Sequence, residues 1–489
     1  MRAASGRRGL LFPRISCRMA RIPYSKERVL LMNRYIGNKA FYRKLFTVMI
    51  PIFLQNLITN FVSLLDNVMV GQVGTEPMSG VAIVNQLLFV FNLCVFGGLA
   101  GPGIFTAQFF GKGDQEGVRQ TMRVKLFVAA GAVLLFGGVL LRFGGDLISL
   151  FLHEGEEGLD LAATLRYGRD YLAVMLWQLV PFAAGQIYSS TMRQAGETVL
   201  PMKAGIIAVF VNLVFNYVFI FGKLGVPAMG VVGAAWATVL ARFVECGIVM
   251  IWPYRHRDRC PYVEGAFRSL RVNGALFRQI AAMGLPLLLN ELLWSGGMTT
   301  LNQCYSLRGL EVVSAFNISS TISNLFFCAF IAMGDAIAIF IGQLLGAGEL
   351  EKAREDDRKL LAFSVAQSLV VGGLMALAAP LLPDLYNTTP GVKALAVRLL
   401  LVGAALMPVH AYASSCYFTL RSGGKTVITF VFDSLFTWLV SIPAAFFLSR
   451  FTAMPILPMY VVVESLALIK CVLGFCLVRS GRWVVNLVK

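Results

Sequence analysis

Charged residues are scarce in this chain. Asp, Glu, Lys and Arg make up 14% of the 489 residues and hydrophobic residues make up 57%, whereas a typical soluble domain has roughly 25% charged residues. Soluble-looking blocks are also missing, because apolar runs recur from Lys44 to the end of the sequence. This composition excludes a string of soluble domains and indicates a single membrane unit.

The sequence also lacks the motifs of metal sites and of nucleotide hydrolysis. It has three histidines, and its nine cysteines occur singly, without C-x-x-C spacing, so we interpret them as small residues of membrane helices rather than as disulfides or zinc ligands. No G-x-x-x-x-G-K-[ST] phosphate loop is present. We therefore expect neither an enzyme nor a resident cofactor, and an energy source other than ATP.

Apolar runs long enough to cross a bilayer occur twelve times. A transmembrane helix needs ~20 mainly apolar residues. The sequence thus predicts an all-α membrane protein with spans at residues 44–70, 79–109, 122–143, 168–192, 199–222, 228–252, 277–305, 311–345, 360–383, 393–420, 426–449 and 457–478.

Basic residues gather on one side of these spans. Of the 43 Lys and Arg residues, 33 lie in segment 1–44, in the loops after the even-numbered spans and in 479–489, and eight lie in the opposite loops. Because cytoplasmic loops carry the excess of Lys and Arg, we predict a multi-pass protein of the plasma (inner) membrane with both termini in the cytoplasm. An anionic inner leaflet accounts for the net charge of +17 without a nucleic-acid partner.

The first 31 residues are basic but have no long apolar region and no small-residue cleavage site. These features argue against a signal peptide. We interpret this segment as a disordered extension, or else Met32 is the true first residue.

The chain repeats itself. Pro51 matches Pro286, and AQFFGKGDQEGVRQ (107–120) matches GQLLGAGELEKARE (342–355), both at an offset of 235. TMRQAGETV (191–199) matches TLRSGGKTV (419–427) at an offset of 228, and an acidic insertion near 154–160 accounts for the difference. Each half therefore holds six helices, and we predict two pseudo-symmetric six-helix lobes.

The predicted divisions are a basic N-terminal segment (1–43), an N-terminal lobe (44–252), a cytoplasmic linker (253–276), a C-terminal lobe (277–480) and a cytoplasmic tail (481–489).

Duplicated six-helix lobes are typical of transporters that rock around a central site. An ion gradient, of H⁺ or Na⁺, would then be the energy source, and it requires ionisable groups inside the bilayer, where such groups are costly and usually functional. Six carboxylates lie well inside the predicted spans: Asp66, Glu245, Glu291, Asp335, Asp433 and Glu464.

Asp66 is the strongest candidate for a cation-coupling residue. On a helix it shares one face with Gln55 and Thr59. Asn212 and Asn216 lie one turn apart in the fifth span and Thr238 lies in the sixth, and their oxygens could coordinate a hard cation or hold Asp66 in position. Capping by Asp66 at an interface and helix-to-helix adhesion by the amides are the alternatives.

Glu291 is the second candidate. It lies in the seventh span, where its counterpart in the first half is Asn56, while the counterpart of Asp66 is Leu301. A carboxylate in this position could take up and release a proton, or make a purely structural hydrogen bond. For Asp335, Asp433, Glu245 and Glu464 we expect structural or interfacial roles.

Five segments resemble the multidrug and toxic compound extrusion (MATE) family, across essentially all of residues 32–480. The resemblance implies antiport, in which inward H⁺ or Na⁺ drives drugs and organic cations outward by alternating access. The segments are PIFLQNLITNFVSLLDNVMVGQVG (51–74), AQFFGKGD (107–114), TMRQAGETVLPM (191–202), NLVFNYVFIFGKLGVPAMGVVGAAWATV (212–239) and IGQLLGAGELEKA (341–353).

The resemblance also implies a coupling site. One branch of the family binds the cation through residues similar to Asp66, Asn212 and Thr238 and through a second carboxylate, for which this chain has Asn216. Asp66 is thereby a possible Na⁺ ligand, and a proton-only or altered ion stoichiometry stays open. Another branch pairs a glutamate similar to Glu291 with an aspartate in helix ten, but span 393–420 contains no acid.

Three functions therefore remain at the level of the sequence. The first is secondary active efflux of small organic, cationic or amphipathic molecules by a monomer. The second is a flippase for lipid-linked precursors, against which the few intramembrane Lys and Arg residues argue. The third is a membrane scaffold without transport.

Overall fold

The computed structural model describes residues 35–152 and 160–489, with the backbone alone at 63, 64, 67 and 68. Regular structure in this part of the chain is helical throughout, and twelve helical spans are long and apolar enough to cross a membrane. The predicted fold class is confirmed. The expectations about residues 1–31 and about the insertion near 154–160 fall outside the described residues, apart from Asp160.

Six spans form the first half of the chain. The fourth consists of two helices, α5 and α6, joined by a short turn at Leu176–Gln178. The bounds are α2 (Lys39–Gly71), α3 (Thr75–Lys112), α4 (Gln115–Ser149), α5 (Leu161–Met175), α6 (Leu179–Gln194), α7 (Val199–Phe221) and α8 (Gly230–Arg255).

The second half repeats this order. Its eleventh span contains two π-helical turns, at Val431–Leu435 and Thr437–Ser441, and its twelfth span is interrupted near Leu466. The bounds are α9 (Gly274–Ser306), α10 (Leu310–Gly346), α11 (Leu350–Ala378), α12 (Pro390–Ser422), α13 (Thr426–Phe430), α14 (Ile442–Phe451), α15 (Ile456–Ser465) and α16 (Ala467–Arg479).

Polar residues begin several helices at the positions where the chain turns. The Asn38 side chain accepts a hydrogen bond from the Phe41 amide at 2.8 Å at the start of α2, and Asp114 does the same for Gly117 at 2.8 Å at the start of α4. Such caps satisfy amide groups that have no partner within the helix. The end positions of the helices are therefore encoded locally.

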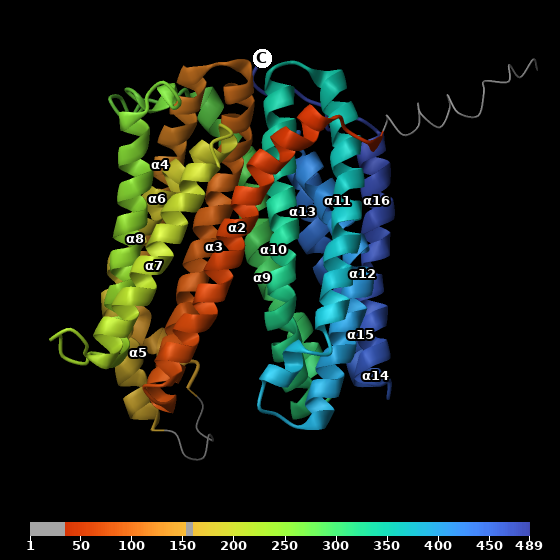
Figure 1. Cartoon of the computed structure of the whole chain (residues 1–489). Helices are drawn as coiled ribbons and strands as arrows, with labels where there is room; N and C mark the ends of the chain where they lie inside the picture. Colours follow the sequence, from red (N-terminus) through yellow and green to blue (C-terminus); the bar gives the residue numbers. More distant parts are fainter. Residues whose placement is uncertain (1–34, 153–159) are drawn as a thin grey trace, which may run out of the picture.

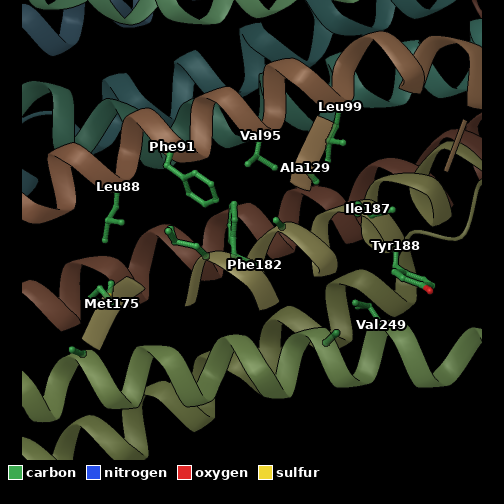
Figure 2. Packing of buried hydrophobic residues seen from close by; sticks show 14 of the residues in the cluster. Leu88, Phe91, Val95, Leu99, Ala129, Met175, Phe182, Ile187, Tyr188 and Val249 are labelled. Carbon is green, nitrogen blue, oxygen red and sulfur yellow. The ribbon is translucent and has the colours of Figure 1, made fainter. Parts of the chain in front are cut away.

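Helices α3, α4, α5, α6 and α8 enclose the core of the N-terminal lobe. Phe91 on α3 packs against Phe182 on α6 with ring centroids 5.9 Å apart, and Val249 of α8 belongs to the same cluster (Figure 2). Inside a membrane the association of helices depends on such close packing, because lipid tails are as apolar as the side chains. The lobe is thus a packed body in its own right.

The two lobes meet at one end of the bundle. This end, which we call the basic face, is where α2 and α9 begin and where α3 and α10 finish. Leu45 and Ile52 of α2 pack with Phe340 of α10, and Ile280 of α9 packs with Phe105 of α3. Toward the opposite end, which we call the open end, the two groups of helices diverge (Figure 1).

Two glycines at equivalent positions of the repeat permit the closest approach of the lobes. A Cβ atom on Gly111 of α3 would collide with the main chain of Gln343, and one on Gly346 of α10 would collide with the main chain of Gln108. Their numbers differ by the repeat offset of 235. The requirement for glycine here is steric, because both residues have ordinary helical backbone angles.

We expect Gly111→Ala to loosen the contact at the basic face, because the neighbouring backbone cannot yield as a flexible side chain would. Overpacking of this kind costs about 1–3 kcal/mol, so the purified variant should unfold at a lower temperature. Gly131→Ala on α4 is the matched control, since a Cβ atom there meets nothing within 4 Å. Equal thermal stability of the two variants would contradict the steric role.

Candidate functional site

Asp66 lies near the end of α2, on the face of this helix that packs against α7. Gln55 lies on the same face, with its side chain against Gly205 of α7. Thr59, which helical spacing also placed on this face, is exposed. The polar stripe expected from the sequence thus exists for Gln55 and Asp66, and it is directed at a neighbouring helix of the same lobe.

The four residues predicted for the N-terminal lobe come together. Asn216 Nδ2 donates a hydrogen bond to Asp66 Oδ1 at 2.7 Å. Asn212, one turn earlier on α7, lies 3.2 Å from Asn216 and 3.2 Å from the Thr238 hydroxyl of α8. Asn212 and Asn216 are 6% and 1% exposed, so this polar cluster is enclosed by α2, α7 and α8.

The amide of Asn212 has two useful orientations. In one, its Nδ2 donates to Thr238 and its oxygen faces the Asp66 carboxyl group. In the other, its nitrogen donates to Asp66 Oδ1 and Oδ2 at 2.8 and 3.0 Å, and its oxygen accepts from Thr238 at 3.2 Å. An ionised carboxylate accepts only, whereas a protonated one can donate. The first orientation therefore suits protonated Asp66 and the second suits ionised Asp66.

Further polar groups surround this cluster. Arg242, one turn beyond Thr238 on α8, interacts electrostatically with Asp66 and forms an ion pair with Glu245 at 2.7 Å. Asn216 Oδ1 is buried and has no hydrogen-bond partner among the described residues. Oxygens of a carboxylate, two amides and a hydroxyl are the donor types that hard cations prefer, so the same residues could hold either a proton or a monovalent cation.

Glu291 lies apart from this cluster, in the other lobe. Its side chain on α9 lies against Gly97 of α3, at the contact between the lobes. Arg421, Asp335 and Asp433 are its charged neighbours. The structure therefore does not bring Glu291 together with Asp66.

Three of the remaining carboxylates have a basic partner within their own lobes. Glu245 forms an ion pair with Arg242 and Asp433 with Lys470 at 3.0 Å, while Glu464 lies 3.2 Å from the His410 ring. Asp433 belongs to a π-helical turn and also accepts a hydrogen bond from Asn290 at 3.3 Å. Among the described residues no group of three or more His, Cys, Asp or Glu could hold a metal ion.

Sequence reasoning did not single out Arg242 and Lys470, two basic residues in the middle of spans. They stand 228 positions apart, which is the second repeat offset. Each forms an ion pair with a carboxylate of its lobe. Their equivalence under the repeat was the signal that could have identified them.

The helix faces that meet at the basic face are exposed toward the open end. On α3, Val90 lies two turns before Gly97 and is 38% exposed. On α9, Trp294 and Met298 follow Glu291 along the same face and are 39% and 40% exposed. Apolar and aromatic side chains thus border the space into which the lobes diverge.

Comparison with known proteins gives one consistent result. The family model MatE matches residues 51–218 and 286–447. The chain is 24% identical over 449 residues to a probable multidrug resistance protein NorM of Thermotoga maritima, with 90% of this chain and 93% of that protein covered. It is also 24% identical to the multidrug resistance protein MdtK of Edwardsiella ictaluri, over 83% of this chain and 87% of that protein.

Two solved structures share the fold. One is the outward-facing conformation of a multidrug resistance MATE family transporter of the MOP superfamily, with a TM-score of 0.81 and 19% identity over 92% of this chain and 98% of that one. The other is a MOP superfamily transporter from Pyrococcus furiosus, with a TM-score of 0.78 and 19% identity over the same shares. The family model covers most of both halves, and the twelve-helix fold agrees with it. The chain therefore belongs to the MatE family, the multidrug and toxic compound extrusion (MATE) family that its sequence resembles.

Proposed function

We propose that this protein exports small organic molecules by antiport against H⁺ or Na⁺. The relatives carry the description multidrug resistance protein, which supports the substrate class. The observation that carries the coupling mechanism is the Asp66 carboxyl group, which two amides contact inside a membrane lobe. A carboxylate in that environment is energetically costly, and residues of this kind usually have a functional role.

Proton uptake at Asp66 would change the hydrogen bonds that join α2, α7 and α8. Ionised Asp66 accepts from both Asn212 and Asn216. Once protonated, it would donate to the Asn212 oxygen, and the Asn212 amide would turn its nitrogen to Thr238. Na⁺ would instead require the amide oxygens to face Asp66. Because Asn212 can turn either its nitrogen or its oxygen to Asp66, this geometry is compatible with H⁺ or Na⁺ as the coupling ion.

Alternating access would then consist of breaking the contact at the basic face and closing the open end. The lobes, residues 44–252 and 277–480, would move as units joined by the linker 253–276. Trp294 and Met298 border the space between them, and aromatic and thioether side chains suit amphipathic or cationic solutes. We propose that the protein works as a monomer.

Asp66→Asn should reduce ion-driven efflux to the background of empty vesicles, because an amide of the same shape cannot exchange a proton. The measurement is solute export from proteoliposomes under an imposed pH gradient and, separately, an imposed Na⁺ gradient. Asp146→Asn, an exposed acid on α4, is the control and should export at the wild-type rate. Full activity of Asp66→Asn under either gradient would refute the coupling role.

Glu291→Gln should impair efflux by a different route, since Glu291 lies at the lobe contact rather than in the Asp66 cluster. If Glu291 exchanges protons, the loss should appear in ion-driven export while solute binding to detergent-solubilised protein is unchanged. Glu311→Gln at the exposed start of α10 is the control. If Glu291→Gln exports at the wild-type rate, the Glu291 carboxyl group has no role in coupling and its role is structural.

We propose that the basic face lies in the cytoplasm of the cell, with both termini there. Cysteine introduced at Lys223, in the loop between α7 and α8, should react with a membrane-impermeant thiol reagent in intact cells. Cysteine introduced at Arg257, in the linker, should react only after permeabilisation. The reverse pattern would invert the orientation that the basic loops predict.

A further inference from the structure

A cavity of about 460 Å³ lies between the lobes at the basic face. The N-terminal lobe contributes Arg43, Lys44 and Thr47 of α2 and Gly196 of the turn after α6, and the C-terminal lobe contributes Ile339, Phe340 and Gln343 of α10. This volume lies within the roughly 300–1,000 Å³ that is typical of small-molecule sites. Lys44 Nζ lies 4.6 Å from the centre of the Phe340 ring.

The repeat provides a counterpart of this cavity. The offset of 235 relates Phe340 to Phe105 and Gln343 to Gln108, and the offset of 228 relates Gly196 to Gly424. These three counterparts also lie at the contact between the lobes, where α3 meets α9 and the turn after α12. The protein therefore has two related crevices, one on each side of the lobe contact.

The tail of the chain fills the counterpart crevice. Leu487 lies against Gly424, and Val488 packs with Phe105 and Ile280. The Gln108 side chain holds the tail in place, because its Oε1 accepts from the Leu487 amide at 2.8 Å and its Nε2 donates to Val485 O at 3.4 Å. The tail thus occupies one crevice and contacts both lobes there, whereas no segment of the described residues occupies the cavity at Arg43 and Lys44.

The charge of the cavity indicates what could fill it. Glu349 and Asp356, the acids near Lys44, already form ion pairs with Lys352 at 2.7 Å and Lys359 at 2.9 Å. Arg43 and Lys44 form no ion pair among the described residues. The cavity is therefore cationic, which disfavours the basic segment 1–31 as its occupant and favours an anion.

We propose that this cavity binds the phosphate group of an anionic lipid headgroup. Arginine matches two phosphate oxygens with its planar fork, and lysine adds a point charge. The Thr47 and Gln343 side chains are polar groups of the same wall, while Val48 and Phe340 provide apolar surface for the glycerol and upper acyl region. A lipid in this position contacts both lobes and so stabilises the conformation closed at the basic face, as residues 485–488 do on the other side.

The test measures binding of short-chain phosphatidylglycerol to the purified full-length protein in neutral detergent by native mass spectrometry, with phosphatidylcholine as the competing lipid. The wild-type protein should prefer phosphatidylglycerol. Each basic residue near an anionic headgroup contributes about fivefold to binding, so Arg43→Gln with Lys44→Gln should bind about thirtyfold more weakly. Arg43→Lys, which keeps the charge, should lose no more than about fivefold.

Arg278→Gln is the matched control, because Arg278 is the repeat counterpart of Arg43 and is exposed at the basic face outside the cavity. It should bind phosphatidylglycerol as the wild type does, and equal losses in the two variants would overturn the proposal. If an equal concentration of inorganic phosphate displaces the lipid, free phosphate is the ligand of this cavity and the proposed lipid site is overturned. If the lipid binds only to a variant that lacks residues 1–31, that segment occupies the cavity in the full-length protein, and this result would also overturn the proposal.

Discussion

A carboxyl group inside the apolar part of a lobe is the constraint on which the N-terminal half is built. A buried carboxylate needs hydrogen-bond donors or a counter-charge. Here Asn216 and Asn212 supply the donors, Thr238 fixes the second amide, and Arg242 supplies a positive charge that is itself shared with Glu245. Three helices are thereby tied to the state of one ionisable group, which is what coupling an ion to a conformational change requires.

The contact between the lobes, in contrast, does not depend on a charged group. It consists mainly of apolar side chains and of small residues at positions such as Gly111 and Gly346, where main chains approach closely, together with neutral hydrogen bonds such as those of Gln108 to the tail. Such a contact can form and separate without breaking buried ion pairs, whose separation would be expensive. The contacts of Asp433 with Lys470 and of Glu464 with His410 lie within one lobe, so the proposed movement of the lobes would not break them.

Local sequence patterns predicted the twelve spans, the duplication and the residues that gather around Asp66. Helical periodicity placed Asn212 and Asn216 one turn apart, and family resemblance placed them opposite Asp66. The position of Glu291 against Gly97 and the filling of one crevice by residues 485–488 could not be predicted in this way, because both depend on how two lobes dock. Arg242 and Lys470 correspond to each other under the offset of 228, so comparing the halves could have identified both.

The two halves share the same order of helices but differ in their polar residues. At the repeat offsets, Asp66 corresponds to Leu301, Asn212 to Val440, Asn216 to Ala444 and Thr238 to Leu466. Leu301 is 6% exposed in an apolar cluster with Cys304 and Met459. Every polar group of the Asp66 cluster is therefore replaced by an apolar side chain, so that the proposed ion binding would change the internal hydrogen bonds of one lobe only. In the proposed mechanism the duplicated scaffold would provide two bodies that rock against each other, and the loss of symmetry at four positions would decide which of them responds to the ion.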